Sequence, residues 1–407
     1  MEKINGGVTV AKGYKAGAVA AGIKYSGRDD MALVISEVPA VVAGTFTTNV
    51  VKAAPVKWSK KIVDEKQCVR AMVLNSGIAN AATGPKGDEA NEAMAQAVAD
   101  TFGFDKYEVL TCSTGVIGMQ LPVDRVQNGV KLFTDALDDT VEAGTKAAKA
   151  IMTTDTVKKE FAASFTIDGK EVKLGGMSKG SGMIHPNMAT MLSLVTTDVA
   201  ITKEMLQKVV SKLVAKTFNM ISVDRDTSTN DTFCVMANGL AGNKVIDCEN
   251  DDYKAFEEAL EYVMTSLAKL MASDGEGATR LFETKVMNAA TYEDAAVLAK
   301  SVISSNLVKT AIFGADANGG RILCALGYSG VDFDPEKVDL TIVSPAGSID
   351  LFKQGAMLEF DEDVAKKVLL ENEIIALVDM HAGSSEAVAW GCDLSYDYVK
   401  INGDYRS

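Results

Sequence analysis

The stretch from Gly175 to Leu192 constrains this chain more than any other. Its first half carries four glycines and is followed by Pro186, which ends helices and central strands, so this half predicts an irregular loop. Its second half changes abruptly, because Thr190 opens the apolar and β-branched run 190–198, which predicts a buried strand. A threonine is therefore expected to begin a core strand directly behind a glycine-rich loop.

This placement suits an N-terminal threonine nucleophile. If the Ala189–Thr190 bond is cut, Thr190 carries a hydroxyl and a free α-amine on the same residue. The amine titrates at about 7.7–8.0, so part of it is neutral near pH 7 and accepts the hydroxyl proton. Threonine paired with its own amine is one of the recurring forms of nucleophilic catalysis. The alternative is that Thr190 is an ordinary first residue of a buried strand and that the glycines form a turn.

A second stretch with candidate catalytic groups runs from Val109 to Gly118. It predicts a strand that leads into a loop, where the Thr114 hydroxyl and the Gly115 backbone N–H can face a developing oxyanion. Preorganised donors of this kind contribute about 10² to 10³ in rate each. The alternative is a plain turn after a strand.

Composition excludes several classes of function. The 407 residues suffice for two or three domain-sized units, and a net charge of −14 without a basic stripe excludes nucleic acid as a partner. Because the histidines are only His185 and His381 and there is no Cys-x-x-Cys pair, no metal site is expected. Dispersed cysteines, no signal-peptide pattern and no apolar run of about 18 residues predict a soluble cytoplasmic protein without membrane contact.

Hydrophobic periodicity predicts a mixed α/β chain with many strands. Strands are expected at 31–37, 40–49, 70–74, 161–167, 171–174, 310–313, 321–326, 338–343, 349–353 and 374–380. Helices are expected at 88–102, 124–151, 202–218, 251–272, 293–305 and 361–371. The Asp168-Gly169 pair predicts a tight hairpin turn between two of the strands.

The run from Lys179 to Leu192, Lys-Gly-Ser-Gly-Met-Ile-His-Pro-Asn-Met-Ala-Thr-Met-Leu, closely resembles the self-processing segment of the ornithine acetyltransferase (glutamate N-acetyltransferase) family. The resemblance implies self-cleavage between Ala189 and Thr190. It also implies a sheet-rich αββα-type core, shared with related aminopeptidases, plus a smaller C-terminal α/β domain. Residues 1–189 then form one chain, 190–290 complete the core from the second chain, and 291–407 form the C-terminal domain, whose tail returns to the site.

The same resemblance assigns roles to single residues. Thr190 is the nucleophile, and Thr114 with Gly115 is the oxyanion-hole pair. The remaining residues are expected to bind substrate together with Thr190: Thr153 (favoured over Thr154), Lys179, Glu276, Asn402 and Ser407. Without the resemblance, Lys179 is a solvated loop lysine, Glu276 a surface residue in a turn, and the C-terminus a frayed tail.

The activity that the resemblance implies is acetyl transfer from N-acetylornithine to glutamate in arginine biosynthesis, by a ping-pong cycle through an acetyl-threonine. No metal or cofactor is expected; some family members also take acetyl-CoA as a substrate, and the residues leave that choice open. The expected assembly is a heterotetramer with two copies of each chain.

Two alternatives remain beside this function. A self-processing aminopeptidase or amidohydrolase shares the nucleophile but passes the acyl group to water. A nucleotide-binding module would use the glycines around Lys179, although P-loop spacing is missing and Pro186 prevents the helix that should follow.

The sequence also departs from the family pattern. Where Pro-Asn-Trp-Gly is expected, Ala317 replaces the proline and Gly319 the tryptophan. This puts local packing or substrate preference in question, but not the nucleophile.

Overall fold

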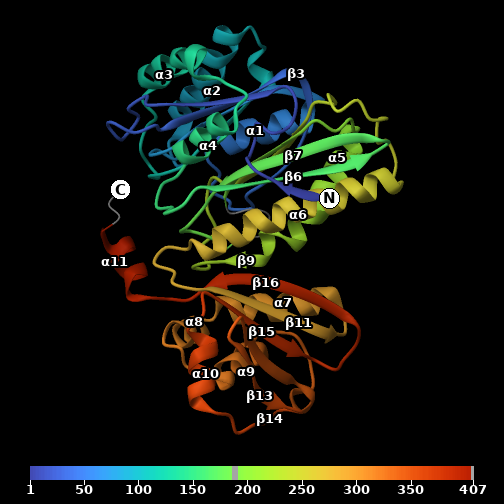
Figure 1. Ribbon diagram of the computed structural model, residues 1–407. Coiled ribbons are helices and arrows are strands. Elements are labelled where there is room, and N and C mark those ends of the chain that lie inside the picture. The colour runs from blue at the N-terminus through green and yellow to red at the C-terminus, as the bar shows by residue number, and fades with distance from the viewer. Residues whose placement is uncertain (186–190, 405–407) are drawn as a thin grey trace.

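The computed structural model describes residues 1–185 and 191–404 and folds them into two β-sheets with helices on their faces (Figure 1). The α/β class is confirmed. The first sheet has the order β1-β6-β7-β8-β10-β3-β4-β5, and β2 also pairs with β3. Its strands are β1 (Glu2–Ile4), β2 (Tyr14–Val19), β3 (Met31–Phe46), β4 (Cys68–Asn75), β5 (Val109–Ser113), β6 (Lys159–Ile167), β7 (Lys170–Lys179), β8 (Leu192–Thr197) and β10 (Thr232–Ala237).

The second sheet has the order β14-β13-β12-β15-β11-β16-β9. It takes in two strands that precede residue 291, since both β9 and β11 belong to it. Its strands are β9 (Ile221–Ser222), β11 (Leu281–Ala289), β12 (Asp339–Ser344), β13 (Gly347–Lys353), β14 (Ala356–Met357), β15 (Glu373–Asp379) and β16 (Ser385–Cys392).

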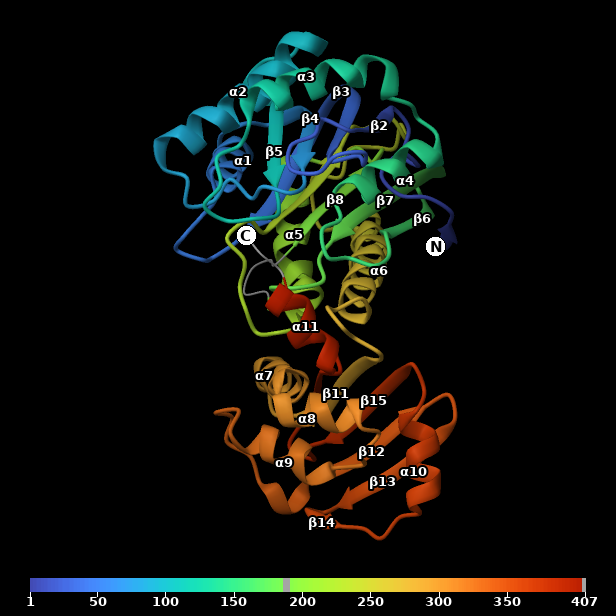
Figure 2. The same cartoon turned by 90° about the vertical axis from the view of Figure 1, so that its left-hand side faces the viewer.

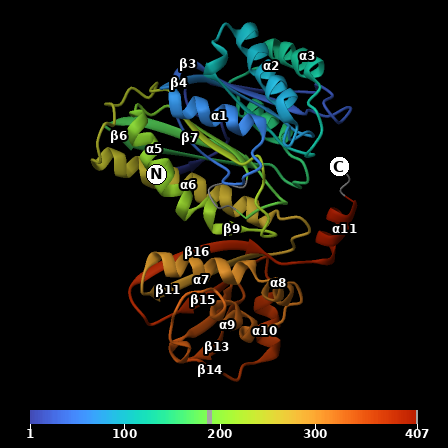
Figure 3. The same ribbon diagram turned by 180° about the vertical axis from the view of Figure 1, so that it is seen from behind.

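Helices cover both sheets. They are α1 (Ala54–Glu65), α2 (Gly84–Phe102), α3 (Val123–Ala136), α4 (Val141–Ala150), α5 (Lys203–Lys216), α6 (Asp251–Ser273), α7 (Tyr292–Ser304), α8 (Asn306–Phe313), α9 (Gly319–Gly327), α10 (Glu362–Leu369) and α11 (Tyr396–Asp404). Short 3₁₀ turns lie at Lys106–Glu108, Phe218–Met220 and Pro335–Lys337. Figures 2 and 3 show α11 at the level between the two sheets.

Successive side chains of β3 point to opposite faces of the first sheet, and different helices cover each face. Val34 and Val42 point into a core shared with α1 and α4. Leu33 points to the opposite face, where α2 and α3 pack, and Ala43 points into the core shared with α5 and α6. This alternation is the period of two that a strand buried on both faces requires.

Helix α6 joins the two sheets. Asn250 caps its first turn by accepting a hydrogen bond from the Tyr253 N–H, and apolar residues at three- and four-residue spacing bury its inner face. The helix contacts β6 and β7 of the first sheet and β11 and β16 of the second. Helix α6 thus lies between the two sheets (Figure 1).

The two strands predicted at 31–37 and 40–49 are one strand, β3. Its register against β4 shifts between Ile35 and Ala40, so Pro39 lies in an irregularity of the ladder. A proline donates no hydrogen bond, and a bulge is where a sheet tolerates it.

The loop predicted from Gly175 onward begins later, because Gly175 and Gly176 lie inside β7. A Cβ on Gly175 would lie 2.1 Å from the Gly7 carbonyl oxygen. The glycine therefore serves the close approach of another backbone segment rather than a turn. The hairpin turn at Asp168-Gly169 is confirmed, with both residues at positive φ.

The long helix predicted at 124–151 is two helices, α3 and α4. Between them, Asp138 exchanges two backbone hydrogen bonds with Ala16 of β2, and the Thr140 side chain caps α4. The helical periodicity continues on both sides of this break, so the pattern alone did not reveal it.

The strands predicted at 310–313 and 321–326 were wrong, since these runs form helices α8 and α9. Ser305 and Asn318 cap them, and short apolar runs do not distinguish a strand from a buried helix. A Cβ on Gly319 would lie 2.7 Å from the Phe352 ring. Phe352 therefore occupies the space beside the position where the family pattern has tryptophan.

Among the described residues, no single helix is long and apolar enough to cross a membrane. The bent pair α7 and α8 meets that test together by length and composition only, and α7 packs on β11 and β16.

Candidate active site

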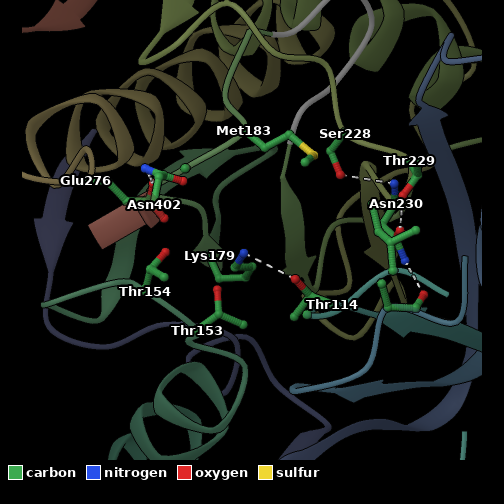
Figure 4. A pocket seen from close by; sticks show the side chains of 14 residues that line it. Thr114, Thr153, Thr154, Lys179, Met183, Ser228, Thr229, Asn230, Glu276 and Asn402 are labelled. Carbon is green, nitrogen blue, oxygen red and sulfur yellow. Dashed lines mark hydrogen bonds between the residues drawn. The ribbon is translucent and has the colours of Figure 1, made fainter. Parts of the chain in front are cut away.

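A cavity of about 150 Å³ opens beside the ends of β5 and β7 (Figure 4). It gathers segments that are far apart in the sequence. Its lining residues are Ala79, Thr114, Gly115, Ile117, Thr153, Thr154, Lys179, Gly182, Met183, Ser228, Thr229, Asn230, Glu276 and Asn402. Every described residue to which the sequence assigned a role in the site lies in this one cavity.

Thr114 and Gly115 follow β5 at the cavity wall. The Thr114 N–H donates to the Asn75 carbonyl at 3.0 Å, and its hydroxyl accepts a hydrogen bond from Lys179 Nζ at 3.2 Å. The hydroxyl proton is therefore left to donate elsewhere. Gly115 has φ +129°, and a Cβ there would lie 2.2 Å from the Gly77 carbonyl carbon. Within residues 1–185 and 191–404, no acceptor is recorded for the Gly115 N–H.

Lys179 ends β7 and is only 9% exposed. Burial lowers the pKa of its ammonium, while the Asp155 carboxylate acts in the opposite direction. Figure 4 shows the ammonium directed into the cavity, with Thr114 on one side and Thr153 and Thr154 on the other. A compact cation in this position suits a carboxylate ligand.

Glu276 lies in the loop after α6 and is 8% exposed. Its Oε2 accepts a hydrogen bond from Asn402 Nδ2 of α11 at 2.7 Å. A Cβ on Gly182 would lie 2.3 Å from the Glu276 carboxyl carbon, so a glycine is required for this approach. The carboxylate is a natural partner for an ammonium group of a ligand.

Thr153 and Thr154 follow α4, and both are half-buried side chains of the cavity wall. The Thr153 N–H donates to Asp155 Oδ2 at 3.0 Å, which fixes the backbone here. The preference for Thr153 over Thr154 stays a prediction, because both face the cavity.

The loop before β10 contributes residues to which the sequence assigned no role. Asn230 Nδ2 donates to the carbonyls of Ala79 and Ser113, at 2.5 and 2.8 Å, and its Oδ1 accepts from the Thr229 hydroxyl. It thus ties this loop to the segments that carry Thr114 and Gly115. The polar run 221–232 was the available signal.

Asp231 is a further residue that the sequence did not single out. It is 1% exposed and, in the described parts of the chain, its Oδ2 has no hydrogen-bond partner. Burial raises the pKa of this carboxyl well above its usual value. It lines a small inner cavity of about 20 Å³ together with Thr114, Lys179 and Met191.

Three predicted site residues, Ala189, Thr190 and Ser407, lie outside the described residues. Met191, which follows Thr190 in the chain, lines the inner cavity. Within residues 1–185 and 191–404, no group of three or more histidine, cysteine, aspartate or glutamate side chains is gathered as a metal site.

Comparison with known proteins now decides the family. The family model described as "ArgJ family" matches residues 15–407. The chain belongs to the ArgJ family. Among curated ArgJ relatives, the "Arginine biosynthesis bifunctional protein ArgJ" of Caldanaerobacter subterraneus is 52% identical, with 100% of both chains covered. The "Glutamate N-acetyltransferase" of Methanocaldococcus jannaschii is 46% identical, again over 100% of both. The family expectation from the sequence is confirmed.

A solved ArgJ structure agrees with the fold. The arginine biosynthesis bifunctional protein of Bacillus halodurans is 46% identical, with a TM-score of 0.50. The match covers 52% of this chain and 98% of the solved one. The solved ArgJ chain is therefore about half as long as the chain described here.

Proposed function

We propose that this ArgJ-family chain transfers an acetyl group from N-acetylornithine to glutamate. The observation that carries the proposal is the presence of Lys179 and Glu276, with opposite charges, in one cavity with Thr114 and Gly115. An amino acid has a carboxylate and an ammonium or amide nitrogen at its α-carbon, and this pair matches both ends. The name of the archaeal relative, glutamate N-acetyltransferase, supports the same activity.

The mechanism assigned to the site is a ping-pong cycle. The Thr190 hydroxyl attacks the acetyl carbonyl and its α-amine takes the proton. The Thr114 hydroxyl and the Gly115 N–H stabilise the oxyanion, which collapses as ornithine leaves with the proton. The glutamate amine then attacks the threonine ester, and the released acetylglutamate restores Thr190. This cycle uses no metal or redox cofactor.

Self-cleavage must precede this cycle, because it frees the Thr190 amine. The same hydroxyl attacks the Ala189 carbonyl, and water then releases residues 1–189 from the ester. The half-length solved chain of the Bacillus relative supports such maturation, since curated relatives match this chain over their full length. A cut at Ala189–Thr190 divides this sequence into two nearly equal parts.

Several finer expectations accompany the proposal and stay predictions. Residues 190–290 complete the core of the first chain, and 291–407 form the C-terminal domain. Ser407 reaches the site together with Asn402. The assembly is a heterotetramer with two copies of each chain, and the protein is cytoplasmic.

The alternative activity is amide hydrolysis by the same nucleophile. It differs in one step, because water rather than glutamate accepts the acetyl group. Lys179 and Glu276 favour transfer, since both suit an amino-acid acceptor. Acetyl-CoA is a second candidate donor, and the word "bifunctional" in the bacterial relatives' names motivates its inclusion in the test.

The experiment is an acetyl-transfer assay with N-acetylornithine and, separately, with acetyl-CoA as donor. We expect wild-type protein to form acetylglutamate and to migrate as two bands on a denaturing gel. Thr190→Ala should stay whole and inactive. Thr166→Ala, an exposed threonine on β6, is the matched control and should behave like wild type.

Each other outcome has a defined meaning. An active Thr190→Ala variant refutes the mechanism. Release of acetate without acetylglutamate identifies a hydrolase. N-terminal sequencing of the smaller products should find a chain that begins Thr-Met-Leu-Ser, and a mature enzyme without it contradicts the assignment of Thr190.

A further inference from the structure

Lys159 is a buried lysine that the mechanism does not use. It opens β6, its side chain is 0% exposed, and it does not line the active-site cavity. Its Nζ lies 2.5 Å from Asp155 Oδ1 and 2.5 Å from Asp274 Oδ2. We call these three residues the Asp155–Lys159–Asp274 triad.

Each carboxylate of the triad holds backbone of a segment that lines the cavity. Asp155 Oδ1 accepts from the Gly180 N–H at 2.8 Å, next to Lys179, and its Oδ2 accepts from the Thr153 N–H at 3.0 Å. Asp155 thereby links the threonine segment to the end of β7.

Asp274 links a third segment to the same ammonium. Its carboxylate accepts from the Thr156 N–H at 3.0 Å, and its carbonyl accepts from the Ser181 hydroxyl at 2.7 Å. The Glu276 N–H donates a hydrogen bond to the Ser181 carbonyl at 2.9 Å. The segment that carries Glu276 is thus joined to the segments that carry Thr153 and Lys179.

Asp155 of the triad is ionised at neutral pH. Burial raises the pKa of Asp155, but the charges of Lys179 and Lys159 outweigh burial and lower that pKa to about 2. Buried ions are expensive to desolvate, and apolar residues of the same volume often give equal stability. A buried triad is therefore better explained by the geometry that it imposes than by stability alone.

We propose that Lys159 is a positioning residue, whose ammonium holds the segments bearing Thr153, Lys179 and Glu276 at the separation that an amino-acid substrate requires. This inference rests on the function proposed above. Without the ammonium, two buried carboxylates face each other and repel, so the segments that they hold move apart. A displacement of about 1 Å in a binding residue is enough to lower activity about 10²-fold.

The test compares Lys159→Met, Lys159→Arg and Lys158→Met in the full chain. Methionine keeps most of the length without the charge, and arginine keeps the charge. Lys158 is the exposed neighbour, which bonds Glu160 outside the cavity and serves as the matched control. KM and kcat for transfer from N-acetylornithine to glutamate are measured with the melting temperature and the gel pattern.

Lys159→Met should raise KM for both amino-acid substrates about tenfold or more, with a smaller fall in kcat per cleaved molecule. Lys159→Arg should recover part of the loss, and Lys158→Met should match wild type. A folded Lys159→Met variant with wild-type KM overturns the proposal, and so does a loss confined to kcat.

If Lys159→Met does not fold, a second variant, Asp274→Asn, provides the test. Asp274→Asn keeps the Asp155–Lys159 pair and an acceptor oxygen, but weakens the attraction of the ammonium for the Glu276 segment. It should raise KM severalfold, and a wild-type KM overturns the proposal. If wild type transfers no acetyl group, the proposed function fails, and Lys159 is judged by ornithine binding in calorimetry. Lys159→Met must then weaken that affinity, and unchanged affinity overturns the positioning role.

Discussion

At the scale of single residues, the cavity is shaped as much by glycines, which have no side chain, as by charged groups. Gly182 has no side chain where the Glu276 carboxylate lies, and Gly115 has none where the Gly77 backbone passes. In the first case the neighbour is the end of a flexible side chain, which can shift. In the second case it is backbone, which cannot.

Gly182→Ala should therefore displace the Glu276 carboxylate without unfolding the protein. We expect KM for N-acetylornithine to rise about tenfold, which is the effect of losing about 1.4 kcal/mol of charge-assisted binding. Steady-state kinetics with a melting curve check this. Gly327→Ala, where a Cβ meets open space, is the control. Unchanged KM in Gly182→Ala contradicts the role of Glu276.

Lys179 should give substrate binding a pH dependence. Burial, the largest effect, lowers the pKa of this ammonium, and the charge of Lys159 lowers it further. The carboxylates of Asp155, Asp231 and Glu276 act in the opposite direction and raise the pKa. Because the pKa is lowered overall, the proton is lost below the usual lysine value of about 10.4, and affinity for a carboxylate falls as pH rises through it. KM measured from neutral to alkaline pH should rise accordingly. Lys179→Arg stays charged and should flatten this rise; an identical rise in that variant assigns it to another group.

At the scale of elements, the loop before β10 is tied to the segment that carries the proposed oxyanion pair, Thr114 and Gly115. Asn230 donates to the carbonyl of Ala79, in the loop after β4, and to that of Ser113, the residue before Thr114. Asn230, Ala79 and Ser113 are all buried, so no water replaces a lost hydrogen bond there.

Asn230→Ala should destabilise the fold by about 3 kcal/mol, since two buried carbonyls lose their donor. Denaturant unfolding measures the change. Asn238→Ala removes a similar amide bond to the Lys12 carbonyl in a more accessible loop, and should change the unfolding free energy by less than about 1 kcal/mol. Equal effects of the two variants would show that burial of the Asn230 partners is not the cause.

At the scale of the whole molecule, strands from both sides of the proposed cleavage site are interleaved in one sheet. Strands β8 and β10 follow the site, yet they lie between β7 and β3, which precede it. Separating the two parts would break the β7–β8 and β3–β10 ladders and expose the core that they cover.

The two fragments should therefore stay together after cleavage. We expect one peak in native size-exclusion chromatography that contains both bands of the denaturing gel. The uncut Thr190→Ala variant should elute at the same volume. Elution of the fragments in separate peaks under native conditions would contradict this interleaved sheet.

Local chemistry let the sequence predict much of the candidate site. The glycine-rich run before Thr190, the Thr114–Gly115 pair, Lys179 and Glu276 each lie in short segments whose resemblance to a family is specific. The described members of this set meet in one cavity. The apolar run of β5 and the three- and four-residue spacing of α6 also predicted their elements, because burial selects apolar residues and, in a helix, repeats them at regular intervals.

The tertiary structure decided what depends on residues far apart in the chain. The predicted 124–151 helix is interrupted at Asp138 by backbone hydrogen bonds to Ala16, which hydrophobic periodicity does not reveal. Gly175 likewise lies inside a strand, against the backbone of Gly7. The ammonium of Lys159 meets a carboxylate 115 residues away in Asp274. Sequence alone determined the family and which groups carry the proposed chemistry, since these follow from residue type and local spacing. Only the folded chain determined how those groups are held, because ion pairs and close backbone contacts form between segments that no local pattern connects.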